Sequence, residues 1–289
     1  MLIGHQRQWQ FLKQAAESDK ISHAYLFSGQ EKLGKKTMAI EWISCLFGEN
    51  LQGKLHPDFI LIEPQNKEIQ IGQIRDLIWK LSLKPYSAPL KTAIIDQAHL
   101  MNEEAQNCFL KTLEEPKGKT LLILITEYPE MLFPTILSRV QRIKFYPVKK
   151  IEIENYLKNQ KISKEEAEKI TELSLGRPGI AIDFVLQPKK LESWQEKTKE
   201  LIKISNADLA SRFQYAKDLS GELQGLKETL DIWLSYFRNV LIEEINSQSK
   251  KYSLNKLKNI LKLIQKTNFL ISTTNINPRL ALEILMLEL

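Results

Sequence analysis

The segment Gly29-Gln-Glu-Lys-Leu-Gly34-Lys35 has the pattern G-x-x-x-x-G-K, and it constrains this chain more than any other feature. It follows a short apolar run, Ala24–Ser28, and it opens a stretch of helical periodicity from about Lys35 to Phe47. In that context the glycines let backbone N–H groups surround phosphate oxygens, and Lys35 reaches the β- and γ-phosphates. An ordinary glycine-containing turn is the weaker alternative, because strand, glycines and lysine are all in place. The pattern predicts a nucleotide-binding loop.

The position after Lys35 departs from that pattern. It is normally Ser or Thr, whose hydroxyl holds Mg²⁺, but here it is Lys36. Thr37 cannot simply substitute, because one residue further along a helix turns the side chain by about 100°. An ammonium group beside the metal position also repels the ion. We therefore expect metal binding to be damaged.

A second defect follows another apolar run, Thr92–Ile95, which ends in Asp96. An aspartate at that place helps to hold Mg²⁺, and hydrolysis needs a neighbouring carboxylate to activate water. The neighbour is Gln97, whose amide cannot accept a proton at neutral pH. Alone, this strand end could be purely structural, but with the loop it indicates a degenerate nucleotide site. We expect no ATP turnover, although Lys35 and the loop backbone still allow weak binding of ATP or ADP.

The first half of the chain alternates apolar runs with helical periodicity. Continuous apolar runs are typical of strands buried on both faces, so they predict a parallel α/β sheet. The predicted strands are Ala24–Ser28, Asp58–Ile62, Thr92–Asp96, Thr120–Thr126 and Arg142–Tyr146.

After Pro147 only helical periodicity remains, interrupted at Gly176-Arg-Pro-Gly179. The fold class is therefore α/β followed by all-α. We predict three parts, namely an α/β module over 1–147, a small helical segment over 148–190 and a larger helical domain over 191–289.

Composition narrows the setting of the protein. The 289 residues carry a net charge of +6, which permits nucleic-acid contact without demonstrating it. Two distant cysteines, Cys45 and Cys108, favour a reducing compartment. The polar start offers no signal peptide, and we find no apolar stretch of the roughly 18–20 residues that spans a bilayer. We expect a cytoplasmic protein without membrane contact.

Further motifs extend along nearly the whole chain. They are His56-Pro-Asp-Phe59, Ile94-Ile-Asp-Gln-Ala98, Asn102, Leu110-Lys-Thr-Leu-Glu-Glu-Pro116, Pro134-Thr-Ile-Leu-Ser-Arg139 and Asn277-Pro-Arg-Leu-Ala-Leu-Glu283. Together with the phosphate loop they resemble the delta-prime family of bacterial DNA polymerase III clamp-loader subunits. The Leu-Lys-Thr-Leu-Glu-Glu-Pro and Ser-Arg motifs are specific to clamp-loader AAA+ proteins.

The resemblance implies an AAA+ α/β module, a three-helix lid and a helical collar through which five subunits form an open ring. Its implied partners are the motor subunits, the clamp-opening subunit, primer-template DNA and, indirectly, the sliding clamp. Many relatives carry a four-cysteine zinc module before the His-Pro-Asp segment, but here residues 47–55 contain no cysteine. We therefore expect no zinc and no required cofactor.

The resemblance also suggests roles for individual residues. Arg139, with Ser138 before it, would reach the ATP site of a neighbouring subunit as an arginine finger. Judged by spacing alone, Arg139 is more simply interpreted as a surface arginine that pairs with a carboxylate. The family usually continues Ser-Arg-Cys, and Val140 at the third position leaves Ser138 and Arg139 unchanged. Lys111 would meet the DNA backbone from the inside of the ring.

Two more residues keep alternatives open. Thr126 ends a predicted strand, where it either senses the γ-phosphate or caps the strand. Arg177 either serves as the lid's second sensor or lies on the surface at a helix break.

These observations favour a largely non-hydrolysing stator of a clamp loader, whose nucleotide-site residues are Gly29, Gly34, Lys35, Thr37 and Asp96. Two alternatives remain, namely an ATP-hydrolysing motor subunit of the same loader and a DNA-binding adaptor outside any ATPase ring.

Overall fold

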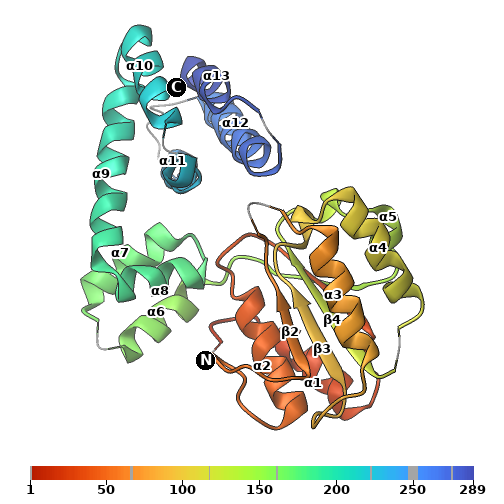
Figure 1. Cartoon of the computed structure of the whole chain (residues 1–289). Helices are drawn as coiled ribbons and strands as arrows, with labels where there is room; N and C mark the ends of the chain where they lie inside the picture. The colour runs from red at the N-terminus through yellow and green to blue at the C-terminus, as the bar shows by residue number, and fades with distance from the viewer. Residues whose placement is uncertain are drawn as a thin grey trace. The chain divides into compact units, whose positions relative to one another are not determined.

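A computed structural model describes residues 2–65, 68–116, 118–160, 162–221, 223–246, 253–274 and 276–289. The chain divides into two compact units, Met1–Ala181 and Ile182–Leu289 (Figure 1). The finer division expected from the sequence, with boundaries after residues 147 and 190, stays a prediction.

The first unit is built on a parallel sheet, as the apolar runs predict. Its spatial order is β2-β3-β4-β1-β5, and every neighbouring pair is parallel. The strands are β1 (Ala24–Ser28), β2 (Phe59–Ile62), β3 (Lys91–Ile95), β4 (Thr120–Thr126) and β5 (Gln141–Lys144). All residues of β1 and β3 are buried, whereas β5 at the sheet edge buries only Ile143. Asp96 therefore lies just beyond the carboxyl end of a central strand.

Helices cover both faces of this sheet (Figure 1). Side chains alternate along a strand, so Tyr25 and Phe27 face one core, while Ala24 and Leu26 face the other. The first core is closed by α1 (Gln6–Glu17) and α2 (Lys35–Phe47). The second is closed by α3 (Ile71–Ser82), α4 (Glu103–Glu114), the short α5 (Pro134–Leu137) and the 3₁₀ turn η1 (Ala98–Leu100). A second 3₁₀ turn is η2 (Pro129–Met131).

One buried carboxylate fixes the connection between α3 and β3. The Asp58 carboxylate accepts backbone N–H bonds from Tyr86 at 2.8 and 2.9 Å, from Ser87 at 2.9 Å and from Ala88 at 3.0 Å. Its Oδ1 also lies 3.2 Å from Lys91 Nζ. Burial alone would raise the pKa of the Asp58 carboxyl, but these donors outweigh burial and hold that pKa well below its ordinary range. In the His-Pro-Asp motif, Asp58 therefore has a structural role.

The chain leaves the sheet through α6 (Lys150–Asn159), α7 (Lys164–Ser174) and α8 (Pro178–Leu186). The predicted interruption between 176 and 179 is confirmed, since Leu175 and Gly176 adopt φ of 51° and 74° and end α7. A Cβ at Gly176 would lie 2.7 Å from Val148 O, so this close approach requires glycine.

The described part of the second unit is helical, as predicted. Its helices are α9 (Pro188–Ser205), α10 (Leu209–Ser220), α11 (Leu223–Asn246), α12 (Leu254–Thr273) and α13 (Pro278–Glu288). Trp194 and Trp233 are buried in this unit. Arg212 donates to the carbonyls of Ser205 at 2.8 Å, Ala207 at 3.0 Å and Met286 at 3.2 Å, which ties α10 to α13. Across the described residues, every helix is too short or too polar to cross a lipid bilayer.

Candidate nucleotide site and arginine segment

The phosphate loop has the backbone that its glycines allow. Gly29 has φ of 148°, and a Cβ there would lie 2.5 Å from Phe145 O. Gly34 has φ of 90° and directly precedes α2. Lys35 is only 6% exposed, and its Nζ donates to Gly29 O and Gln30 O, each at 2.5 Å. The lysine expected to reach phosphates is therefore bonded to the carbonyls of its own loop.

Other segments of the first unit also bond the loop. The backbone N–H of Gly179, in α8, donates to Lys32 O at 2.8 Å. The His5 Nε2 lies at hydrogen-bond distance, 2.9 Å, from Leu33 O. Burial lowers the pKa of the His5 imidazole, which favours the neutral ring. Sequence reasoning missed His5, because nothing in the sequence marks a residue 28 positions away as a partner of the loop.

An ammonium group occupies the region where a divalent cation would be held. Lys36 Nζ lies 2.5 Å from Glu63 Oε1 and 3.2 Å from Asp96 Oδ2. Glu63 directly follows β2 and Asp96 directly follows β3, so adjacent parallel strands bring both carboxylates to one edge of the sheet. Burial alone would lower the pKa of Lys36, but the two carboxylates outweigh burial and raise it. These residues do not fit Mg²⁺, because the ammonium group of Lys36 is already paired with both acids and would repel the ion.

Glu63 was not among the predicted site residues. Its position immediately after an apolar run is the signal that could have identified it, since carboxyl ends of parallel strands meet at one edge.

Thr37, which was among the predicted site residues, has an exposed side chain on α2.

The residues after β3 and β4 are held by local hydrogen bonds. Gln97 has φ of 51°, and its N–H donates to Asp96 Oδ1 at 3.0 Å. The Thr126 hydroxyl accepts the Tyr128 N–H at 3.0 Å and lies 3.0 Å from His99 Nδ1. These bonds suit the strand-capping role of Thr126, while its sensing role stays a prediction.

Arg177 lies inside the first unit and is only 5% exposed. The alternative that placed it on the surface is therefore wrong. It directly precedes α8, whose first turn packs on the loop through Gly179. Whether it senses nucleotide remains a prediction.

The arginine segment connects α5 to the edge strand β5. Arg139 Nη2 lies 2.7 Å from Glu114 Oε1, and Nη1 donates to Thr135 O at 2.9 Å and to Ser138 Oγ at 3.2 Å. The Ser138 hydroxyl itself donates to Thr135 O at 2.9 Å. The side chain of Arg139 stays 35% exposed. The pairing with a carboxylate that spacing alone favours is present, and the action on a neighbouring subunit stays a prediction.

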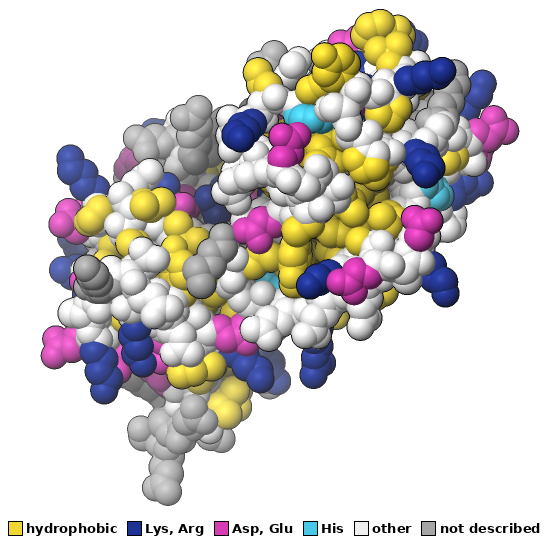
Figure 2. Space-filling model, turned by 90° about the horizontal axis from the view of Figure 1, so that it is seen from below, with side chains coloured by type: hydrophobic (Ala, Val, Ile, Leu, Met, Phe, Trp, Pro, Cys, Tyr) yellow, Lys and Arg dark blue, Asp and Glu magenta, His cyan; other side chains and the backbone are white. Residues whose placement is uncertain are grey.

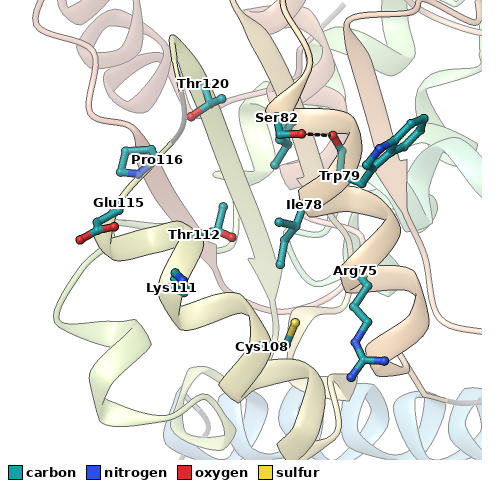
Figure 3. Close-up of a pocket in the computed structure, with 11 residues that line it drawn as sticks. Arg75, Ile78, Trp79, Ser82, Cys108, Lys111, Thr112, Glu115, Pro116 and Thr120 are labelled. Atoms are coloured by element: carbon teal, nitrogen blue, oxygen red, sulfur yellow. Dashed lines mark hydrogen bonds between the residues drawn. The ribbon is translucent and has the colours of Figure 1, made fainter.

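Lys111 lies on the wall of a pocket between α3 and α4, with a volume of about 670 Å³ (Figure 3). Arg75 and Trp79 from α3 and Glu115, which directly follows α4, line the same pocket. Trp79 is 62% exposed, so it lies outside the core of the first unit. On the face seen in Figure 2, Lys and Arg side chains are interspersed with Asp and Glu rather than gathered in one patch. DNA contact by Lys111 stays a prediction.

The cysteine-free segment 47–55 leads from the end of α2 toward β2. Cys45 and Cys108 are both free thiols. Within the described ranges, no group of three or more His, Cys, Asp or Glu side chains is arranged to hold a metal ion. The expectation that zinc is absent stays a prediction for elemental analysis.

Comparisons with known proteins agree with this architecture. A family model described as "DNA polymerase III, delta subunit" matches residues 4–149. The chain is 29% identical to DNA polymerase III subunit delta' of Bacillus subtilis over 262 residues, covering 84% of this chain and 79% of that protein. It is 34% identical to DNA polymerase III subunit delta' of Pseudomonas aeruginosa over 135 residues, 41% of each chain.

Among solved structures, a DNA polymerase III gamma subunit-related protein of Thermotoga maritima superposes with a TM-score of 0.55. The alignment covers 96% of this chain and 97% of that one at 18% identity, so it speaks for the fold alone. The fold class expected from the sequence, a parallel α/β module followed by helices, is confirmed.

Proposed function

This chain belongs to the delta-prime family of DNA polymerase III subunits, and from that premise we propose that it is a largely non-hydrolysing stator of a clamp loader. In this role it helps to place the sliding clamp on primed DNA. It also supplies Arg139 to the nucleotide site of a neighbouring subunit.

The observation that carries the stator proposal is the position of Lys36. Its ammonium lies within 3.2 Å of both Glu63 and Asp96. A magnesium ion between these acids would have to displace a cation already paired with them. With Gln97 in place of the general base, this site offers neither an open position for the metal nor the carboxylate that activates water. The motor-subunit alternative requires both functions and is therefore disfavoured.

The arginine-finger proposal rests on the family and on the setting of Arg139. The guanidinium is partly exposed on a short segment, and the degenerate site of its own subunit has little use for it. A planar fork of N–H donors suits the oxygens of a transferring phosphoryl group. A finger of this kind typically contributes about 10³–10⁵-fold to the rate of the site that it completes.

The partners follow from the same premise. We propose that the second unit assembles with the motor and clamp-opening subunits, and that Lys111 lies where primer-template DNA passes. The adaptor alternative has no comparable support, because the relatives that the chain resembles are subunits of DNA polymerase III.

Reconstitution with the other loader subunits tests the arginine role. We expect Arg139→Ala to leave folding and assembly intact, because a partly exposed ion pair contributes little stability. It should lower ATP hydrolysis stimulated by clamp and primed DNA, partially if other sites keep their own arginines. Arg139→Lys should fail almost as badly, since a point charge does not reproduce the fork.

Arg142→Ala is the matched control, because Arg142 is an exposed arginine on the adjacent strand, and its Nη2 donates to Leu137 O at 3.4 Å. If the Arg139→Ala complex hydrolyses ATP and loads clamps at the parental rate, the arginine-finger proposal is wrong.

A further inference from the structure

Two neighbouring carboxylates at the end of α4 have different surroundings. Glu115 lines the pocket between α3 and α4, where it is drawn beside Pro116 in Figure 3. Glu114 instead pairs with Arg139 at 2.7 Å. The Leu-Lys-Thr-Leu-Glu-Glu-Pro motif is thereby joined directly to the Ser-Arg motif by a contact that neither motif predicts.

The contacts of Arg139 divide into two kinds. Thr135 O and Ser138 Oγ are neutral acceptors within four residues of Arg139, so they move with the same short segment. Among the described residues, only Glu114 forms an ion pair with Arg139, and it comes from a different helix, 25 residues away. Glu114 therefore sets the direction of the guanidinium relative to the sheet.

The guanidinium keeps donors for a ligand in this arrangement. Arginine has five N–H donors, and the contacts to Glu114, Thr135 and Ser138 use three of them. The remaining two can meet phosphoryl oxygens while the other three hold the group still. A long arginine side chain that is free before binding loses conformational freedom when it is immobilised, which weakens its effect by up to about tenfold. An arginine side chain that is already held in place before binding avoids this loss.

We propose that Glu114 is a positioning residue for Arg139, holding its guanidinium in the orientation that completes the neighbouring subunit's nucleotide site. This inference rests on the proposed function. It assigns to Glu114 no contact with nucleotide and no role in nucleotide affinity. Its effect passes through Arg139 alone, and this distinguishes it from a residue that merely stabilises the end of α4.

The test compares Glu114→Ala with Glu115→Ala in the reconstituted loader with clamp and primed DNA. We expect Glu114→Ala to lower kcat for ATP hydrolysis up to about tenfold, because freeing one side chain costs at most about that factor. The KM for ATP and the melting temperature of the chain should stay the same. Glu115→Ala should retain the parental rate, and Glu114→Gln should recover part of the loss, because its amide oxygen still accepts a hydrogen bond.

A double-mutant comparison gives the sharper readout. In an Arg139→Ala background, Glu114→Ala should cause no further loss, whereas a general defect in α4 would lower the rate again. Equal losses in both backgrounds therefore overturn the inference. A parental rate for Glu114→Ala overturns it as well, and so does a raised rate, which would make Glu114 a restraint.

The two proposals fail in distinguishable ways. If Arg139→Ala slows the loader and Glu114→Ala does not, the inference is wrong and the arginine-finger proposal stands. If Arg139→Ala leaves the rate unchanged, the arginine-finger proposal itself is wrong, and the inference falls with it.

Discussion

The buried Asp58 offers the most direct test of how this α/β module is held together. Asp58→Asn keeps the shape of the side chain but removes its charge and replaces one acceptor oxygen with an N–H₂ donor. That donor would face backbone N–H groups of Tyr86, Ser87 or Ala88, and Lys91 would lose its carboxylate partner. The change therefore leaves several buried donors without acceptors.

The expected loss in unfolding free energy is about 3 kcal/mol at pH 7. Removing one partner of a buried ion pair typically costs about 3–5 kcal/mol. The low end applies because the side chain of Tyr86 is 85% exposed, so the loop amides can turn toward water. Urea unfolding at pH 7 measures the free energy, and hydrogen exchange at the Tyr86, Ser87 and Ala88 amides reports the local change.

The pH dependence has a definite sign. The folded-state pKa of Asp58 lies below the ordinary value of 3.8. Its contribution is therefore complete above about pH 4 and is lost as the pH falls through the folded pKa. The stability gap between the parent and Asp58→Asn should shrink in that acid range. Asp76→Asn, at an exposed position of α3, is the control. A gap below about 0.5 kcal/mol at pH 7, with unchanged exchange of the three amides, would refute the reasoning.

Two further predictions concern the degenerate site and the cysteine-free segment 47–55. The isolated chain should hydrolyse no ATP above the background of the Lys35→Ala variant. Gln97→Glu alone should not create activity, because Lys36 still occupies the metal region. Steady turnover on the scale of AAA+ motors that Lys35→Ala abolishes would contradict this. Elemental analysis should find no stoichiometric zinc, since a structural site needs four ligands in close array and residues 47–55 contain neither cysteine nor histidine. A content of about one zinc per chain that resists gentle chelation would overturn this prediction.

The framework of the α/β module could be predicted because its signals are local. A continuous apolar run ending at a glycine indicates both the strand β1 and the loop after it, and α2 begins and ends at the predicted residues, Lys35 and Phe47. Helix α4 ends before Pro116, as the motif indicates. Strand ends shifted by one or two residues, because pairing with the neighbouring strand decides where a strand stops.

The contacts that define the site could not be predicted, because they join residues far apart in the sequence. Lys36 meets Glu63, 27 positions away, and Arg139 meets Glu114, 25 positions away. The sequence identified Lys36 because it departs from the phosphate-loop pattern, and Arg139 because it agrees with the Ser-Arg motif. It could not identify their partners, since those depend on the strand order of the sheet and on the packing of α4 against α5.

The two partners also show why the degenerate site is difficult to reverse. Replacing Lys36 by Thr would restore a metal-binding hydroxyl, but it would leave Glu63 and Asp96 facing one another without the cation that now lies within 3.2 Å of both. Two like charges that share a site disfavour ionisation of one of them. Adding Gln97→Glu would place a third acid beside them, directly after Asp96. Lys36 is thus both the group that opposes Mg²⁺ and the cation paired with Glu63 and Asp96, so we expect hydrolysis to need Mg²⁺ binding and both substitutions together rather than either one alone.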